Sequence, residues 1–256
     1  MRMMIIIAMN TCREGIRNQV LYAMVFFALA MIGVSSVLSR LTMGQEYRVL
    51  ENFGLTTLSI IGVVITIFMG VTLVQREIDR RTIFALLSTP LKRYQFIVGK
   101  FFGLVAIIML VVGSMGLLFV ALLILVDRSV VVYIWLPIAM TIMELTVIAA
   151  ATVLFSATTS PVLAAMFSIG FFVMGRLTGS IGELSQLVES RLARMIANRL
   201  LTYLLPHLEL FDFRAAAIYR QAVSTEQWLF ALCYGMTYSL VLVIVASMIF
   251  ERRDIT

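Results

Sequence analysis

The chain has 256 residues, of which 61% are hydrophobic and only 13% are charged, with a formal net charge of +6. Soluble domains are close to half apolar and about one quarter charged, so this composition excludes a soluble globular protein. It predicts an integral membrane protein of a single domain, with membrane lipids and no nucleic acid among its partners.

Six stretches are long and apolar enough to cross a bilayer, whose hydrocarbon core of about 30 Å requires about 20 residues of helix. The fold is therefore expected to be all-α, with six transmembrane helices. They are predicted at residues 20–38, 53–74, 101–126, 130–155, 162–181 and 228–250.

Lys and Arg of the short loops fall on one side of this six-helix arrangement, within residues 1–19, residues 75–100 and the C-terminal tail. Such residues favour the cytoplasmic side, so both termini are predicted to be cytoplasmic. Residues 176–227 hold six further arginines on the opposite side. That segment is long and structured, and long segments contribute less to orientation.

At the N-terminus, apolar side chains recur at helical spacing, while Arg13, Arg17 and other polar residues occupy the remaining face. This pattern predicts an amphipathic helix lying on the inner leaflet. It either anchors the chain through anionic lipid or clasps the first span to a second subunit. The apolar positions are Ile5, Met9, Cys12 and Ile16.

Residues 75–100 form a charge-rich island between long apolar runs. Asp79 can cap a short helix that Pro90 ends, and a second helix is predicted to begin near Lys92 and continue into the third span. A cytosolic helix with an apolar stripe requires a groove in a partner protein, unless it lies on lipid. The stripe comprises Ile83, Phe84 and Leu87.

Two charged residues fall within predicted spans. Glu144 lies near the middle of the fourth span, where a carboxylate costs about 2.5–3.5 kcal/mol on insertion scales. It must face protein or water, either on a translocation path or as a carboxyl that joins helices near Thr141 and Thr146. Arg176 interrupts the fifth span, and it either reaches the outer interface or lines a polar cavity.

Residues 182–227 are predicted to be external and to contain amphipathic helices. The longer helix covers residues 183–205 and ends at Pro206, and the stretch HLELFDFRAAAIYR after it is predicted to form a shorter interfacial helix. The longer helix is either a lid over the outer mouth of a dimer or a passive spacer. Its arginines would then face head groups or the exit of the pathway; they are Arg191, Arg194 and Arg199.

No enzymatic motif is found. The single histidine, His207, cannot form a paired metal site, and Gly99–Lys100 is followed by Phe101, so the chain lacks the GxxxxGK[ST] phosphate-binding loop. No GxSxG motif occurs. We therefore expect no catalytic residue, no metal and no cofactor in this chain.

The segment REIDRRTIFALLSTPLKRYQFIVGKFFG resembles the cytoplasmic signature of permease subunits of the type-2 ABC exporter superfamily. The stretches AMNTCREGIRNQVLYA, FSATTSPVLAA, LLPHLELFDFR and FERRDI resemble further landmarks of that superfamily, in the same order. The resemblance covers the whole chain. It is strongest for the subset that includes the permeases of nitrous oxide reductase maturation and of gliding motility.

This resemblance implies a homodimer of six-helix permease subunits in the bacterial inner membrane, with two copies of a separate ABC ATPase that bind ATP and Mg²⁺. Residues 79–90 would be the coupling helix in an ATPase groove, and Lys100 would hold the neighbouring helix to the ATPase or to lipid head groups. The residues implied in coupling are Glu77, Asp79, Arg80, Arg81, Thr82, Ile83, Phe84, Leu87, Pro90 and Arg93.

The implied activity is export of a substrate, for which lipid-like or amphipathic cargo is one candidate. An alternative is a mechanotransmission or maturation factor that acts on a periplasmic accessory protein, through the same coupling loop. A secondary transporter is a further alternative, but it would show paired buried charges and two similar halves. The sequence has one acid within its predicted spans, Glu144, and no convincing repeat. Larger members carry a folded domain between the first spans, where this chain has only residues 39–52.

Overall fold

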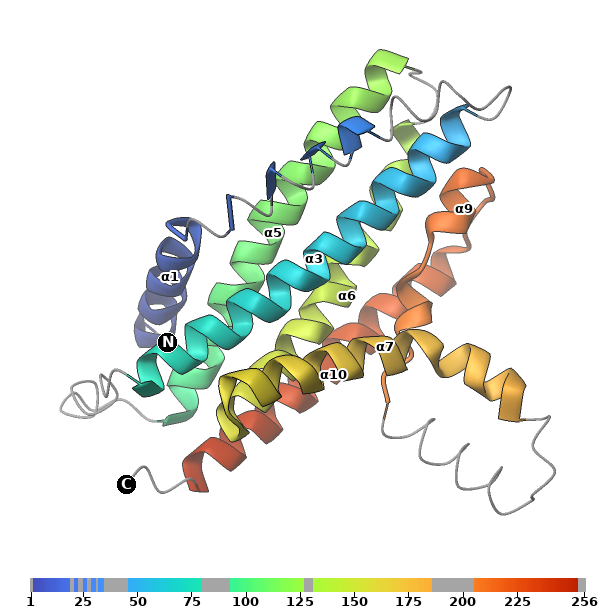
Figure 1. Cartoon of the computed structure of the whole chain (residues 1–256). Coiled ribbons are helices and arrows are strands. Elements are labelled where there is room, and N and C mark those ends of the chain that lie inside the picture. The colour runs from blue at the N-terminus through green and yellow to red at the C-terminus, as the bar shows by residue number, and fades with distance from the viewer. Residues whose placement is uncertain are drawn as a thin grey trace.

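The computed structural model describes residues 2–18, 46–79, 93–126, 131–185 and 205–252, together with short helical pieces between residues 21 and 34. Every element within these ranges is a helix (Figure 1). The all-α prediction is therefore confirmed for the described part of the chain.

Five long helices form the bundle, and each contains a stretch that is long and apolar enough to cross a membrane. They match five of the six predicted spans, while most of the predicted span at residues 20–38 lies outside the described residues. The five helices are α3 (Glu46–Asp79), α5 (Arg93–Val126), α6 (Val131–Thr158), α7 (Pro161–Ser185) and α10 (Thr225–Arg252).

The helices extend beyond the predicted spans because helical residues with polar side chains continue them past the apolar runs. α3 reaches Asp79, and α5 begins at Arg93 and enters the third span without a break, as predicted. α7 continues to Ser185, so the first residues of the predicted outer helix at 183–205 belong to α7. The rest of that predicted helix lies outside the described residues.

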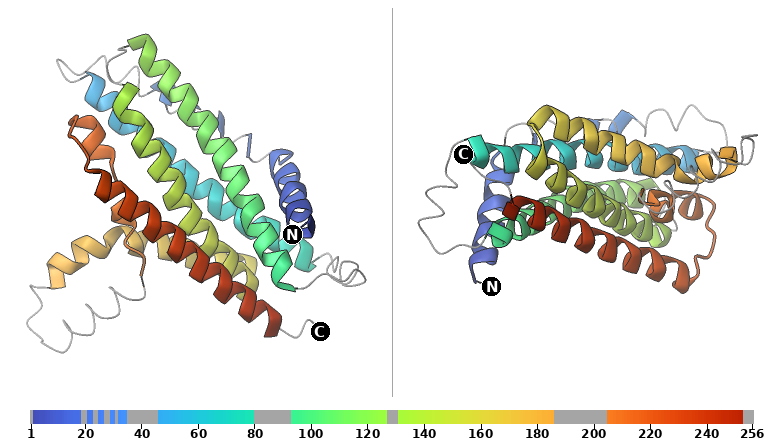
Figure 2. Two further views of the ribbon diagram at one scale, coloured as in Figure 1. Left: turned by 180° about the vertical axis from the view of Figure 1, so that it is seen from behind. Right: turned by 90° about the horizontal axis from the view of Figure 1, so that it is seen from below.

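α6 is the central helix of the bundle and contacts α3, α5, α7 and α10. Figure 2 shows it between α7 and α10 when the molecule is viewed from below. Small residues allow the neighbouring helices to approach closely. A Cβ added at Gly70 of α3 would lie 2.7 Å from Thr152 Cγ2, and one at Gly62 would lie 2.7 Å from Leu145 Cδ1.

The two ends of the bundle differ in what they carry. Both chain termini, the turn between α6 and α7, and the ends of α3 and α5 that flank residues 80–92 lie at one end, which we call the terminal end (Figure 1). The short helix α9 (Arg214–Ile218) and the start of α3 lie at the opposite, distal end. The start of α1 and the end of α10 thus lie at the same end of the described structure.

The turn between α6 and α7 at the terminal end is fastened to α3. α6 ends at Thr158 and α7 begins at Pro161, whose ring is suited to the first position of a helix. The buried Gln75 of α3 donates two hydrogen bonds from Nε2, to the carbonyl oxygens of Ser156 at 2.9 Å and Thr159 at 2.8 Å. These bonds satisfy carbonyl groups that the end of α6 leaves without a helical partner.

The predicted N-terminal helix is found as α1 (Arg2–Ile16), which crosses the bundle obliquely and packs on α5 (Figure 2). Its buried stripe is Thr11 and Gly15, whereas Met9, expected on the apolar face, is 67% exposed. Close packing explains the difference. A Cβ added at Gly103 of α5 would lie 2.6 Å from Thr11 Cβ, so α1 rests on α5 through small residues.

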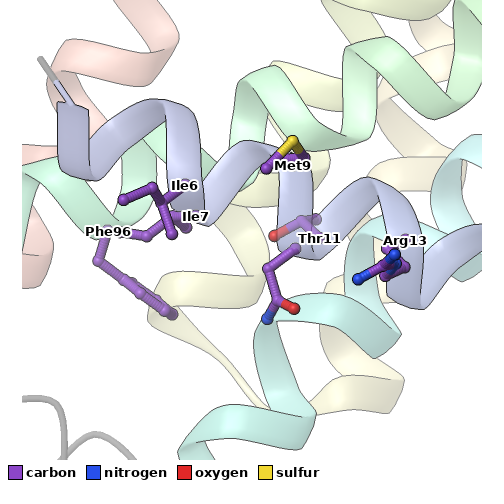
Figure 3. Close-up of a pocket in the computed structure, with 7 residues that line it drawn as sticks. Ile6, Ile7, Met9, Thr11, Arg13 and Phe96 are labelled. Carbon is purple, nitrogen blue, oxygen red and sulfur yellow. The ribbon is translucent and has the colours of Figure 1, made fainter.

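A hollow of about 440 Å³ remains beside this contact, lined mainly by α1 and by Phe96 of α5. Figure 3 shows Ile6, Ile7 and Phe96 at one end of the hollow and Arg13 at the other, with Thr11 between them. Thr11 Oγ1 is buried and has no hydrogen-bond partner among the described residues. The hollow is thus apolar at one end and cationic at the other.

Candidate functional site

The candidate site is a chain of four charged side chains, Glu144, Arg176, Asp212 and Arg214, which we call the charge network. Glu144 projects from the central helix α6 into the bundle and is 1% exposed. Its Oε2 accepts a hydrogen bond from Arg176 Nη2 at 2.8 Å. Burying a carboxylate is costly unless it is paired, and Arg176 supplies the pairing charge.

Arg176 of α7 connects the buried carboxylate to the distal part of the bundle. Its Nη1 donates to Asp212 Oδ2 at 2.8 Å, and its Nη2 also lies 3.3 Å from Ser59 Oγ of α3. The guanidinium carbon lies 5.9 Å from the centre of the Phe172 ring, at cation–π distance. The side chain is therefore directed toward Glu144 and Asp212 inside the described bundle.

Asp212 directly follows the 3₁₀ helix η2 (Leu208–Phe211), and Arg214 is the first residue of α9. We call residues 208–218 the η2–α9 segment. Arg214 donates two side-chain hydrogen bonds to Asp212, from Nε to Oδ1 at 2.8 Å and from Nη2 to Oδ2 at 2.5 Å. A bidentate pair of this kind is stronger and more directional than a single hydrogen bond. Arg214 Nη1 also donates to Thr56 Oγ1 of α3 at 3.1 Å.

The sequence predicted one continuous interfacial helix over the HLELFDFRAAAIYR stretch. The structure instead shows two short helices with a break at Asp212 and Phe213. The break allows the Asp212 carboxylate to accept hydrogen bonds from both Arg176 and Arg214. These ionic contacts outweigh the gain from a few more turns of helix.

The η2–α9 segment is inserted between the long helices rather than lying only on the surface. Leu208 and Phe211 are buried, and a Cβ added at Gly175 of α7 would lie 2.8 Å from Leu208 Cγ. The backbone N–H of His207 donates to the hydroxyl of Tyr234 in α10 at 3.1 Å. The segment is therefore held by α7 and α10, and its charged residues are fixed by packing.

The charges of the network balance, with two carboxylates and two guanidinium groups. Burial alone would raise the pKa of Asp212, but its hydrogen bond to Arg214 and the charges of Arg214 and Arg176 outweigh burial and lower the pKa to about 2. The hydrogen bond to Asp212 raises the pKa of Arg214 above its usual value. Both residues are thus charged at every physiological pH.

One acceptor of the network remains without a partner. Glu144 Oε1 is buried, and no donor reaches it within the described part of the chain. The network therefore joins α3, α6, α7 and the η2–α9 segment, and keeps one polar position deep in the bundle. Such an arrangement can hold the distal end closed or receive a polar group, but it contains no nucleophile with an adjacent base.

No set of three His, Cys, Asp or Glu side chains within the described ranges could hold a metal ion. Of the two charged residues predicted within spans, Glu144 and Arg176, the structure brings both together at one site. It does not place Thr141 or Thr146 on Glu144, since Thr146 Oγ1 bonds to the Ile142 carbonyl oxygen of its own helix.

The predicted coupling residues lie elsewhere. Glu77 and Asp79 belong to the last turns of α3, and Arg93 is the first residue of α5, all at the terminal end. Two predicted groups lie outside the described residues. They are the coupling residues Arg80, Arg81, Thr82, Ile83, Phe84, Leu87 and Pro90, and the lid residues Arg191, Arg194 and Arg199.

Sequence reasoning missed Asp212 and Arg214 as members of a site. The available signal was an acid and an arginine two residues apart in an otherwise aromatic and apolar stretch, FDFR. It also missed Thr56 and Ser59, the hydroxyl groups through which α3 contacts the network. Hydroxyl groups in an apolar helix have no distinctive spacing, so nothing in the sequence marked them.

The model of a family described as ABC-2 family transporter protein matches residues 5–255, nearly the full chain. No curated protein matches the sequence.

Proposed function

Because the chain belongs to the ABC-2 family of transporter proteins, we propose that it couples ATP hydrolysis by a separate ATPase to the export of a substrate. The family match over residues 5–255 is the observation that carries this proposal, and it identifies a multi-pass permease of an ABC transporter. Within the family we assign the chain to the subset of nitrous oxide reductase maturation and gliding-motility permeases.

In the proposed complex, the chain contributes no catalytic residue. ATP and Mg²⁺ are bound by two copies of the partner ATPase, and two copies of this chain form the permease. The complex lies in a bacterial inner membrane, with six spans in each permease chain and the terminal end in the cytoplasm. The positive charge of residues 1–19 and 75–100 supports that orientation.

Residues 80–92 are the proposed site of ATPase contact. α3 delivers the chain to this loop at Asp79, and α5 leaves it at Arg93, both at the terminal end. A partner at the cytoplasmic face would therefore act directly on two long helices. In this proposal Phe84 and Leu87 fill the apolar groove of the ATPase, and the neighbouring arginines contact its rim.

α3 provides the route from this loop to the charge network. The helix is continuous from Asp79 to Glu46, and its hydroxyl groups at Thr56 and Ser59 bond to Arg214 and Arg176. A displacement of α3 by the ATPase would thus also move Thr56 and Ser59, which contact the charge network. We propose that ATP-driven closure of the ATPase pair shifts the bundle between inward and outward states in this way.

The test is co-purification of the permease with its ATPase after Phe84→Asp. An aspartate in an apolar groove removes an anchor worth a few kcal/mol, so the ATPase should dissociate in detergent while the permease stays in the membrane. Phe84→Leu, which keeps the apolar contact, and Arg220→Asp at the distal end should both retain the ATPase. Retention by Phe84→Asp would contradict the coupling assignment and favour a helix lying on lipid.

A further inference from the structure

The distal end has a hollow of about 470 Å³ between the start of α3 and the η2–α9 segment. Its cationic wall comes from Arg48 of α3 and Arg214 of α9, and its aromatic wall from Phe53 and Tyr219. The four side chains belong to segments far apart in the sequence, and direct contacts between α3 and α9 hold them together.

The described residues that line the hollow carry a net positive charge. Among them Asp212 is the one acidic residue, against Arg48 and Arg214, and its carboxylate is shared with Arg176. Arg48 has no acidic partner among the described residues, and its guanidinium carbon lies 5.5 Å from the centre of the Tyr219 ring. That guanidinium is exposed and remains able to bind an anion.

An apolar stripe on α3 leads from the hollow toward the terminal end. It begins at Phe53, whose side chain is 49% exposed although it lies within a membrane-spanning stretch. The stripe positions are separated by seven, four and four residues, so they lie on one face of the helix. They are Phe53, Ile60, Val64 and Phe68.

We propose that this hollow binds the anionic head group of a lipid-like amphiphile, whose acyl chain lies along the α3 stripe. Arginine recognises a phosphate by charge and by paired hydrogen bonds, and aromatic rings are favoured at the depth of the head groups. Arg48 and Arg214 hold the head group, and Phe53 marks where the chain begins. The charge complementarity of the hollow selects an anionic over a zwitterionic head group.

Binding also affects the charge network, because an anion at Arg214 competes with Asp212 for the same guanidinium group. The hollow is therefore connected, through Asp212 and Arg176, to Glu144 in the centre of the bundle. The binding itself requires no ATPase, so it is tested on the purified full chain and stands or falls separately from the proposed transport function.

The first experiment measures retained lipid by native mass spectrometry of the chain, with phosphatidylglycerol and phosphatidylcholine of identical acyl chains. We expect preferential retention of phosphatidylglycerol, and a loss of about fivefold in its affinity for Arg48→Gln, since one Arg or Lys near an anionic lipid contributes about that factor. Arg48→Lys should retain most of the affinity. Arg220→Gln, at an exposed arginine of the distal end that does not line the hollow, is the matched control and should leave it unchanged.

The second experiment locates the acyl chain. In a background without Cys12 and Cys233, a bimane label is placed at Ile60→Cys on the stripe or at Met236→Cys, an exposed position on α10. Brominated phosphatidylglycerol, present as a minor lipid in phosphatidylcholine, should quench the bimane fluorescence more strongly at position 60 than at position 236. Adding Arg48→Gln should abolish that difference.

Five outcomes would overturn the proposal. Equal retention of the two lipids would show that the hollow does not select charge. An equal loss in Arg220→Gln would show only general attraction to anionic lipid. Equal affinity for glycerol 1-phosphate and phosphatidylglycerol would show that the acyl chain contributes nothing. Equal quenching at positions 60 and 236 would show that the acyl chain does not lie along the α3 stripe. A cross-link between two copies of the chain at position 60 would assign the stripe to a dimer interface.

Discussion

Glu144 and Arg176 form a pair whose two members are buried to different degrees. Glu144 is almost fully buried, while Arg176 keeps 18% of its side-chain surface exposed and has Asp212 and Ser59 as further partners. Losing the arginine therefore leaves an isolated buried charge, whereas losing the carboxylate leaves a guanidinium that is still hydrogen-bonded. The two residues should respond unequally to substitution.

We predict that Arg176→Gln destabilises the protein by about 3–5 kcal/mol, the usual cost of leaving one partner of a buried pair. Glu144→Gln should cost distinctly less, because Arg176 retains Asp212. The double variant should be more stable than Arg176→Gln alone. Unfolding in detergent measures all three variants, and additive losses would contradict direct pairing.

Asp212 gives the network a defined pH response. Its pKa is lowered from 3.8 to about 2 in the folded protein, chiefly because the paired arginines outweigh burial. A lowered carboxyl pKa contributes stability that is fully present above the unfolded value and is lost as pH falls toward the folded value. The contribution should therefore be constant at neutral pH and disappear in acid.

We expect the stability difference between the wild type and Asp212→Asn to stay constant down to about pH 4.5 and to shrink between about pH 4 and pH 2. Thermal unfolding in detergent across that range is the measurement. A difference that persists unchanged to about pH 2.5 would show that the Asp212 carboxylate does not stabilise the fold as an ion.

The packing of α1 on α5 shows what helical periodicity in the sequence predicts and what it does not. The existence of α1 follows from helical periodicity in the sequence. Its contact face does not, because Thr11 and Gly15 are not the most hydrophobic residues and the partner surface at Gly103 is visible only after folding. Close approach of small residues, rather than hydrophobicity, selects that face.

Gly103→Val should separate α1 from α5, at a cost of about 1–3 kcal/mol, because its side chain would collide with Thr11. Gly113→Val in the same helix is the control, since a Cβ there meets nothing within 4 Å. The readout is alkylation of Cys12, which is half-buried in α1, in a background without Cys233. Faster alkylation is expected for Gly103→Val alone, and equal rates in both variants would exclude tight packing at this point.

The bundle helices were largely predictable because each contains a long apolar run. Their ends were not, since α3 continues through QREID, where no glycine or proline stops it. The break between η2 and α9 was missed for a different reason. Periodicity favours one helix over that stretch, but the break depends on Arg176, which is 36 residues away in the sequence.

For the whole molecule, the arrangement of loop charges makes a direct topological prediction. A reporter that works only in the cytoplasm should be active when fused after Thr256, and Ser190→Cys should react with an impermeant thiol reagent from outside intact cells. Cys12 and Cys233 are removed in both experiments. Labelling of position 190 only in opened cells would contradict the six-span arrangement.

At the candidate site, the sequence predicted individual charged residues but not which of them the whole fold brings together. Glu144 and Arg176 were each recognisable as charges in apolar runs, because such residues are rare in membrane spans. Their pairing was not predictable, since it depends on the relative rotation and depth of α6 and α7. The same holds for Arg48 and Tyr219, which are brought together only when α9 docks on α3.

The central position of α6 has a consequence for how this protein tolerates change over evolutionary time. An outer helix such as α10 presents one side to lipid, so accepted substitutions there should recur every three to four residues. α6 has neighbours on every side, so the spacing of three to four residues between accepted substitutions should be absent across its middle. Descendants of this gene should rarely differ in that stretch. The buried positions of this middle stretch of α6 are Leu145, Val147, Ile148, Ala149, Ala150, Ala151, Thr152 and Val153.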